Sequence, residues 1–180
     1  MKPQEAERIL AEADLICSAD EVNVALNRVA SELNHALAGR NPVVVSVMGG
    51  AVIFTGQLLP LLTFPLDFDY VHATRYGAAT AGGALQWVVE PRTSVVGRTV
   101  LLLDDILDEG ITLAAIRQHL LVAGATECIT AVFADKAIGR DKPLKADFVG
   151  LTLPNRYVFG YGMDVSGAWR NLPAIYAMKE

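Results

Sequence analysis

Residues 100–112 constrain this chain more than any other segment, and they read VLLLDDILDEGIT. Four apolar residues are followed by four carboxylates within six positions, and then by a glycine and a threonine. The pattern predicts a buried strand over residues 99–103, an acidic turn, and a helix over residues 113–123. Ligands of open α/β sheets bind at the carboxyl ends of strands, and crowded carboxylates are costly without compensation. A cation, sugar hydroxyls or a cationic transition state would compensate them, so this turn is the first candidate for chemistry.

The composition predicts one globular domain that spans residues 1–180. Hydrophobic residues make up 52% of the chain and charged residues 19%, which is typical of a chain with a substantial core. The net charge of −5 argues against a general nucleic-acid binder but allows a small phosphorylated ligand. The sequence contains no apolar run of 18 residues and no basic start followed by an apolar core. We therefore expect no membrane span and a cytoplasmic location.

Helical and strand patterns alternate along the chain. Helices are predicted over residues 4–16, 21–37, 51–62 and 113–123, and strands over residues 43–47, 66–73, 86–90, 99–103, 129–134 and 148–153. The spacing of Ser18 and Glu21 is that of a capping box at the second helix. This alternation predicts an α/β fold with a central, mostly parallel sheet flanked by helices.

Two glycine-rich segments are open to two interpretations each. Gly49 and Gly50 follow the strand at 43–47 and precede a helix, an arrangement that brings backbone close to an anion. A plain tight turn explains them equally well. Residues 74–84, TRYGAATAGGA, form the tip of a predicted hairpin. Such a tip is either a loop without a role or a lid.

Residues 100–112 resemble the motif by which type I phosphoribosyltransferases bind 5-phosphoribosyl 1-pyrophosphate (PRPP). That motif is an apolar strand, two acidic residues, two apolar residues, and a loop that ends in Gly-x-Thr. Residues 147–173, DFVGLTLPNRYVFGYGMDVSGAWRNLP, resemble the C-terminal region of the hypoxanthine-guanine branch, in which a lysine stands twelve residues before a phenylalanine. Here Lys136 stands twelve residues before Phe148. The resemblance covers residues 40–175 and implies the type I fold, with a hood from residues 1–40 and 150–180 and a mobile hairpin lid.

The resemblance implies a purine-salvage reaction. Hypoxanthine or guanine and PRPP give IMP or GMP and pyrophosphate, with Mg²⁺ as the cofactor and a homodimer or homotetramer as the assembly. As pyrophosphate leaves, the ribose gains oxocarbenium character, which nearby carboxylates stabilise while Mg²⁺ neutralises the leaving group. Two alternatives remain open: a non-catalytic nucleotide-sensing regulator on the same fold, and a phosphoribosyltransferase for xanthine or another base.

The resemblance also assigns roles to the acidic segment. Asp104 and Asp105 would accept hydrogen bonds from the ribose hydroxyls and contact the metal indirectly. Asp108 would be the general acid/base beside the purine imidazole nitrogen, and its neighbourhood of carboxylates suits that role. The 5′-phosphate loop would consist of Glu109, Gly110, Ile111 and Thr112, which offer backbone N–H groups at a helix N-terminus.

The remaining predicted site residues come from other segments. Lys136 would donate to the purine O6, Tyr157 would stack on the purine, and the backbone of Val158 would read its edge. Asp164 would contact Mg²⁺ through water, and Arg170 would grip pyrophosphate. The residues at the predicted pyrophosphate turn and in the predicted lid are Gly49, Gly50, Arg75 and Tyr76.

The chain departs from the family pattern at two of these positions. Many relatives have a lysine where Gly49 stands, so a backbone role survives there and a cationic side-chain role does not. Related enzymes often have a small hydroxyl residue where Glu109 stands. The carboxylate of Glu109 is therefore expected to point away from the phosphate.

Overall fold

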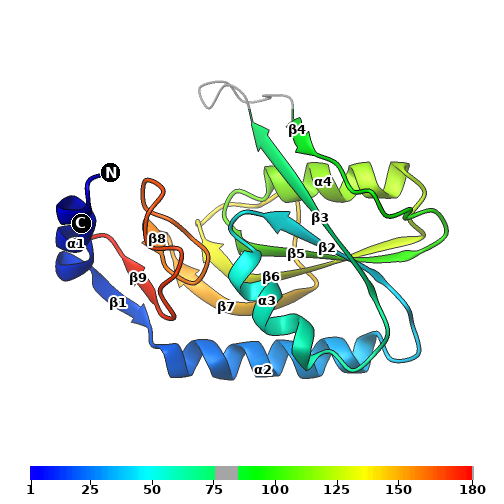
Figure 1. Cartoon of the computed structure of the whole chain (residues 1–180), viewed down its shortest axis with the longest axis horizontal. Helices are drawn as coiled ribbons and strands as arrows, with labels where there is room; N and C mark the ends of the chain where they lie inside the picture. The colour runs from blue at the N-terminus through cyan, green and yellow to red at the C-terminus, as the bar shows by residue number, and fades with distance from the viewer. Residues whose placement is uncertain (76–84, 180) are drawn as a thin grey trace.

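The structure is a computed structural model that describes residues 1–75 and 85–179. Its central strands are β2 (Val43–Met48), β3 (Asp67–Arg75), β4 (Leu85–Val89), β5 (Thr99–Leu107), β6 (Glu127–Ala137) and β7 (Phe148–Pro154). They form one six-stranded sheet in the order β4-β3-β2-β5-β6-β7 (Figure 1). Neighbouring strands are parallel except β3 and β4, which form an antiparallel hairpin. The predicted α/β fold with a mostly parallel sheet is confirmed.

Helices cover both faces of this sheet (Figure 1). They are α2 (Ala19–Ala36) and α3 (Val52–Leu58), which continues into a 3₁₀ turn at Leu59–Leu61, and α4 (Ile111–Val122). Leu101 and Leu103 of β5 belong to the core that contains α2 and α3, whereas Val100 and Leu102 belong to the core that contains α4. Because β5 is buried on both faces, its apolar run shows no alternation with polar residues.

A second, smaller sheet joins the two ends of the chain and is called the hood, although α2, part of the predicted hood segment 1–40, packs on the central sheet instead. The hood consists of β1 (Asp14–Cys17), β8 (Val158–Phe159) and β9 (Ile175–Ala177), in the order β1-β9-β8. The first helix, α1 (Pro3–Glu12), lies beside it (Figure 1). The indole Nε1 of Trp169 donates to the carbonyl of Ala6 at 2.8 Å, which attaches α1 to the C-terminal segment. The hood carries Val158 in β8 and therefore positions the residues predicted to bind the purine.

The helix predicted over residues 4–16 is wrong in its last part. α1 ends at Glu12, Ala13 is extended, and the next four residues form β1. Asp14 of β1 pairs with Ala177 of β9, at the other end of the chain. The strand therefore depends on a distant partner, which the local pattern of apolar residues could not indicate. For the same reason β8 and β9 were not predicted.

β5 is longer than predicted, and this changes the position of the carboxylates. The strand was expected to end at residue 103, but it continues to Leu107, because its pairing with β6 extends to the partners Leu107 and Asp135. Asp104 and Asp105 are therefore strand residues, and the turn begins at Asp108. Successive side chains of a strand point to opposite faces, so Asp104 and Asp105 are directed toward different cavities.

Smaller differences lie at helix ends. The helix predicted over residues 51–62 is divided into α3 and the 3₁₀ turn, which contains Pro60 and its missing N–H group. The capping box is confirmed, since Ser18 N donates to Glu21 Oε2 at 2.8 Å and Glu21 N donates to Ser18 Oγ. Tyr76, predicted to belong to the lid, lies outside the described residues, and Arg75 is the last residue of β3. In the part of the chain that is described, no helix is long and apolar enough to cross a membrane.

Candidate functional site

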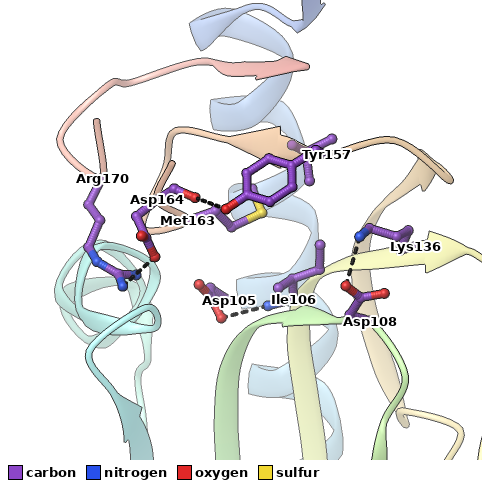
Figure 2. A pocket seen from close by; sticks show the side chains of 9 residues that line it. Asp105, Ile106, Asp108, Lys136, Tyr157, Met163, Asp164 and Arg170 are labelled. Carbon is purple, nitrogen blue, oxygen red and sulfur yellow. Dashed lines mark hydrogen bonds and ion pairs between the residues drawn. The ribbon is translucent and has the colours of Figure 1, made fainter. Parts of the chain in front are cut away.

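Two adjoining cavities lie at the carboxyl ends of the parallel strands. The first has a volume of about 220 Å³ and is shown in Figure 2. It is lined by Asp105, Ile106, Asp108, Lys136, Tyr157, Val158, Met163, Asp164 and Arg170. The second, of about 400 Å³, is lined by Asp104, Ile106, Leu107, Asp108, Glu109, Gly110, Ile111, Thr112 and Leu113. Asp108 and Ile106 belong to both linings, so they mark the boundary between the two cavities.

Asp104 and Asp105 are neighbouring carboxyl groups whose negative charges disfavour each other. Burial raises the pKa of Asp104 well above its usual range, and the charge of Asp105 raises it further. Burial also raises the pKa of Asp105, while its hydrogen bonds and the charge of Arg170 oppose the rise. Their oxygens accept from backbone N–H groups, since Asp105 N donates to Asp104 and Ile106 N donates to Asp105. A ligand that brings hydroxyl donors or positive charge would stabilise the ionised pair.

The glycine turn after β2 lies directly against Asp105. A β-carbon placed on Gly50 would lie 1.9 Å from Oδ2 of Asp105, whereas one placed on Gly49 would meet nothing within 4 Å. The φ angle of Gly162 is +101°, and a β-carbon there would lie 2.1 Å from the carbonyl oxygen of Gly50. The peptide bond between Met48 and Gly49 is cis. Gly50 thus allows backbone to approach the carboxyl group, which a plain turn would not require.

Asp108 and Lys136 form an ion pair at the boundary of the two cavities. Lys136 Nζ donates to Asp108 Oδ2 at 2.7 Å (Figure 2). The lysine side chain is 12% exposed, and the carboxylate side chain is 50% exposed. A ligand can therefore reach the carboxylate, while the ammonium remains largely enclosed. Two predicted site residues are thus in contact: Asp108 is predicted to transfer a proton, and Lys136 is predicted to donate to the purine O6.

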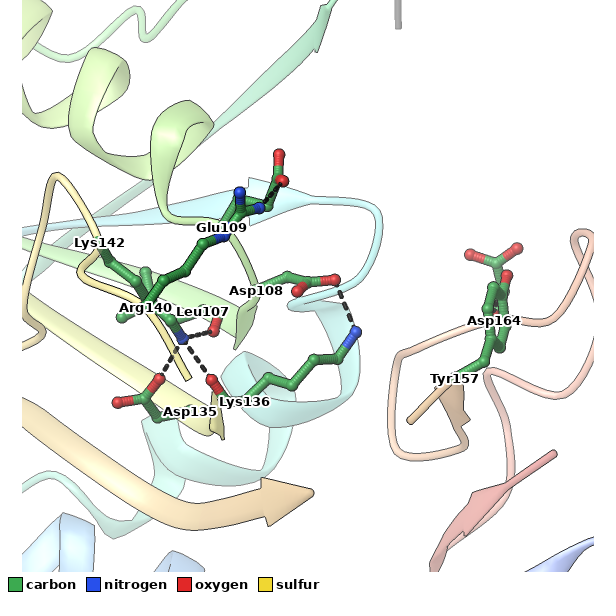
Figure 3. A network of polar contacts seen from close by, with 9 residues as sticks. All are labelled: Leu107, Asp108, Glu109, Asp135, Lys136, Arg140, Lys142, Tyr157 and Asp164. Carbon is green, nitrogen blue, oxygen red and sulfur yellow. Dashed lines mark hydrogen bonds and ion pairs between the residues drawn. The ribbon is translucent and has the colours of Figure 1, made fainter. Parts of the chain in front are cut away.

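The second cavity has the backbone geometry of an anion site. Gly110 has a φ angle of +77° and is the N-cap of α4, which begins at Ile111. The first N–H groups of a helix lack partners within the helix and point toward its N-terminal end. Thr112 lies in this first turn. Glu109 also lines the cavity, and its carboxylate is bound by the guanidinium of Arg140 (Figure 3). The carboxylate charge is therefore partly compensated by Arg140.

Asp164 and Arg170 lie together on the side of the first cavity that is opposite Lys136 (Figure 2). Arg170 Nη2 lies 2.5 Å from Asp164 Oδ1, and Arg170 Nη1 donates to the carbonyl of Gly162. The sequence predicted separate roles for these two residues, and the structure brings them into direct contact. The hydroxyl of Tyr157 lies 3.4 Å from the backbone carbonyl of Asp164, and the tyrosine is 55% exposed. Its ring is thus open to a planar ligand.

Sequence reasoning missed two residues that line the first cavity. Ile106 lies between two carboxylates of the acidic segment, and Met163 follows the left-handed Gly162 in the tail. Both have apolar side chains, which are typical of ordinary core positions, and the sequence gives no signal that separates them from the core. They supply apolar surface beside Tyr157, as a planar heterocycle requires.

Comparison with protein families gives a match over most of the chain. A model of the phosphoribosyl transferase domain matches residues 18–166. The hypoxanthine-guanine-xanthine phosphoribosyltransferase of Tritrichomonas foetus is 34% identical over 164 residues, which cover 89% of this chain and 88% of that protein. The hypoxanthine-guanine phosphoribosyltransferase of Streptococcus pneumoniae strain R6 is 31% identical, covering 92% of this chain and 93% of that protein.

Another relative is a longer protein. The bifunctional protein TilS/HprT of Listeria innocua is 34% identical over 166 residues, which cover 92% of this chain and 26% of that protein. The chain thus spans about a quarter of the length of this relative.

Solved structures share the fold. A hypoxanthine-guanine-xanthine phosphoribosyltransferase superposes with a TM-score of 0.84 at 30% identity, covering 93% of this chain and 97% of that chain. A hypoxanthine phosphoribosyltransferase from Staphylococcus aureus superposes with a TM-score of 0.89, covering 96% of this chain and 95% of that chain. Its identity of 24% supports a common fold and no more.

Proposed function

This chain belongs to the phosphoribosyltransferase family, and from that membership we propose that it transfers the ribose 5-phosphate group of PRPP to hypoxanthine or guanine. The products are IMP or GMP and pyrophosphate. One observation carries the proposal. The Asp108–Lys136 pair stands between a cavity open to a planar base and a cavity with the backbone of an anion site. A purine nucleotide likewise has a planar base at one end and an anionic phosphate at the other, with the ribose between them.

The purine end of the site reads a 6-oxo group. The ammonium of Lys136 has three donors, of which Asp108 takes one. A remaining proton can be donated to O6 of hypoxanthine or guanine, whereas the 6-amino group of adenine is itself a donor and would leave that proton without an acceptor. Tyr157 offers its exposed ring for stacking. These contacts favour 6-oxopurines over adenine.

The ribose end of the site compensates positive charge. The purine nitrogen attacks C1 of the ribose, and the bond from C1 to the pyrophosphate oxygen breaks with its electron pair. Asp104 and Asp105 are costly to ionise in isolation, so they gain most when the sugar becomes cationic and its hydroxyls donate to them. Asp108 takes the proton that the purine imidazole loses. Arg170 and the backbone at Gly50 face the departing pyrophosphate.

The residues present fit a Mg²⁺ ion that is shared with the substrate. Within the described residues, no group of three or more His, Cys, Asp or Glu side chains could hold a metal ion. Mg²⁺ in phosphate-transfer sites keeps several waters and uses one or two carboxylates together with substrate phosphates. Asp164, Asp104 and Asp105 would contact it through that water shell. When bound, the ion supplies charge neutralisation of the leaving pyrophosphate.

Xanthine is a second candidate substrate. Relatives at 34% and 30% identity carry xanthine in their names, and xanthine has the same 6-oxo group that Lys136 would contact. Assembly as a homodimer or homotetramer and a cytoplasmic location remain predictions.

A base-by-base assay tests the proposal. The purified chain is incubated with PRPP, Mg²⁺ and each of hypoxanthine, guanine, xanthine and adenine, and nucleotide formation is followed by absorbance. We expect turnover of hypoxanthine and guanine and little turnover of adenine. Binding of GMP without turnover of any base would contradict the proposed enzymatic function and favour a nucleotide-sensing regulator. Turnover of adenine in preference to hypoxanthine would contradict the assignment of Lys136.

A further inference from the structure

The ammonium of Lys142 is enclosed beneath the candidate site and bonded on three sides (Figure 3). Its Nζ donates to the carbonyl of Leu107 at 2.6 Å, to the carbonyl of Lys136 at 2.7 Å and to Oδ1 of Asp135 at 2.5 Å. The side chain is 11% exposed. An ammonium has three protons to donate, so the fold uses all of them. Lys142 therefore acts on the protein rather than on a ligand.

The three acceptors lie where β5 and β6 cease to pair. Leu107 and Asp135 are the last partners in the register of the two strands. Asp108 follows Leu107 directly, and Lys136 follows Asp135. Lys142 thus bonds the two strand ends at the point where the chain presents the carboxylate of Asp108 and the ammonium of Lys136.

The aliphatic part of the Lys142 side chain also packs against Gly110 of the predicted 5′-phosphate loop. A β-carbon placed on Gly110 would lie 3.6 Å from the β-carbon of Lys142. Lys142 therefore packs against the left-handed residue that precedes α4. One side chain is in contact with the acidic turn, with the end of β6 and with the N-cap of α4.

We propose that Lys142 is a positioning residue, which fixes the separation of Asp108 and Lys136 so that together they match the imidazole nitrogen and O6 of a 6-oxopurine. This inference rests on the proposed function and adds a residue to it. A charge-assisted hydrogen bond is shorter and stronger than a neutral one. Three of them, held in an enclosed site, set the offset of the two strand ends. Without them, the Asp108–Lys136 pair remains but its spacing relaxes.

The test compares Lys142→Met with a matched control, Lys145→Met. Methionine keeps the length of the stem and removes all three donors. Lys145 lies on the same loop and is exposed, and the structure gives its ammonium no hydrogen bond to any described residue. For Lys142→Met we expect KM for hypoxanthine to rise about tenfold and KM for PRPP to stay within about twofold. Its preference for hypoxanthine over adenine should fall, whereas Lys145→Met should match the wild type.

A second variant, Lys142→Arg, keeps the charge and guards against a folding defect in Lys142→Met. The guanidinium is a planar fork and cannot meet three acceptors arranged around one tetrahedral nitrogen. We expect an intermediate rise in KM for hypoxanthine and an unchanged Tm. If Lys142→Met does not fold, the KM values of Lys142→Arg decide the question.

The outcomes separate this inference from the proposed function. A wild-type protein that turns over no 6-oxopurine overturns the proposed function, and the inference with it. A wild-type protein that is active, combined with Lys142 variants whose KM for hypoxanthine is unchanged, overturns the inference alone. The inference is also overturned if KM for PRPP and KM for hypoxanthine rise together and Tm falls, because that result indicates a general loss of structural stability.

Discussion

The ammonium nitrogen of Lys136 lies 2.7 Å from a carboxylate oxygen of Asp108, although the two residues come from the ends of neighbouring parallel strands. The contact places a cation next to the predicted acid/base. It also orients both groups toward the cavity that Tyr157 borders. A base bound there would meet a proton acceptor and a donor side by side.

Replacing Asp108 with Asn should slow turnover without preventing PRPP binding. Asn cannot accept the proton that the purine loses, and loss of general acid/base catalysis costs about 10²–10⁴-fold in rate. We expect kcat to fall in that range, measured by initial rates at saturating PRPP. Asp141→Asn is the control, because Asp141 is an exposed carboxylate on the nearby loop. An unchanged kcat in Asp108→Asn would exclude Asp108 as the acid/base.

Replacing Lys136 with Ala should weaken the preference for 6-oxopurines. The variant loses the donor to O6. Adenine then leaves no lysine proton without an acceptor, so the site rejects adenine less strongly. The ratio of kcat/KM for hypoxanthine to that for adenine should fall by about tenfold or more, and Lys145→Ala should keep the wild-type ratio. If Lys136→Ala also keeps it, base reading belongs to another group, such as the backbone at Val158.

Replacing Gly50 with Ala should impair PRPP use far more than the same change at Gly49. The new methyl group of Gly50→Ala would lie 1.9 Å from Asp105, whereas that of Gly49→Ala would meet nothing within 4 Å. Displacement of a positioning group by about 1 Å can cost up to about a hundredfold. We expect kcat/KM for PRPP to fall at least about tenfold in Gly50→Ala. Equal effects of the two variants would show that the close approach to Asp105 is irrelevant.

Replacing Glu109 with Ser should strengthen PRPP binding. The variant removes a negative charge from the lining of the predicted phosphate cavity and releases Arg140 from its carboxylate. An exposed ion pair is worth up to about 1 kcal/mol, so KM for PRPP should fall roughly two- to fivefold, less at high ionic strength. Glu127→Ser breaks the comparable pair with Arg40 at the start of β6, the strand end opposite the cavities, and should leave KM unchanged. A higher KM in Glu109→Ser would contradict the prediction.

Replacing Asp69 with Asn should destabilise the fold, and the effect should depend on pH. Burial alone would raise the pKa of Asp69, but hydrogen bonds from the backbone N–H groups of Thr93, Tyr70 and Arg92 outweigh it and lower the pKa. The stabilisation is therefore complete above the unfolded-state pKa of about 4. It is lost as the pH falls through the folded-state value.

Urea unfolding of wild type and Asp69→Asn at a series of pH values tests this. Near neutral pH the variant should lose about 1–3 kcal/mol of unfolding free energy, since its amide offers only one acceptor atom. The difference should shrink below about pH 4. Asp67→Asn, which breaks an exposed pair with Arg98, is the control and should cost less than about 1 kcal/mol. A difference between Asp69→Asn and wild type that is constant with pH would contradict the assignment.

The sequence predicted those parts of the molecule that depend on local patterns. Apolar runs predict the buried strands of the central sheet, and the carboxylates after Leu103 indicate the end of the strands at which the cavities lie. The roles of Asp108 and Lys136 came from a resemblance, and their contact follows from the parallel order of β5 and β6.

The remaining features depend on partners that are distant in sequence. β1 exists because residues at the other end of the chain pair with it, so Leu15 and Ile16 alone could not reveal a strand. The role of Lys142 depends on acceptors from two strand ends, and an isolated lysine in a loop gives no sign of them. The contact between Asp164 and Arg170 depends on the left-handed turns of the tail, including Gly162.

The packing of Gly50 between Asp105 and Gly162 has a consequence for how this site can vary. Three segments from separate parts of the chain compete for a volume that does not hold one additional methyl group. A larger residue at position 50 is compatible with the fold only if the side chain at position 105 changes at the same time, and a larger residue at position 162 only if the backbone at position 50 moves. Substitutions at these positions are therefore expected to be epistatic, and variation at the three positions should be inherited as a set rather than one residue at a time.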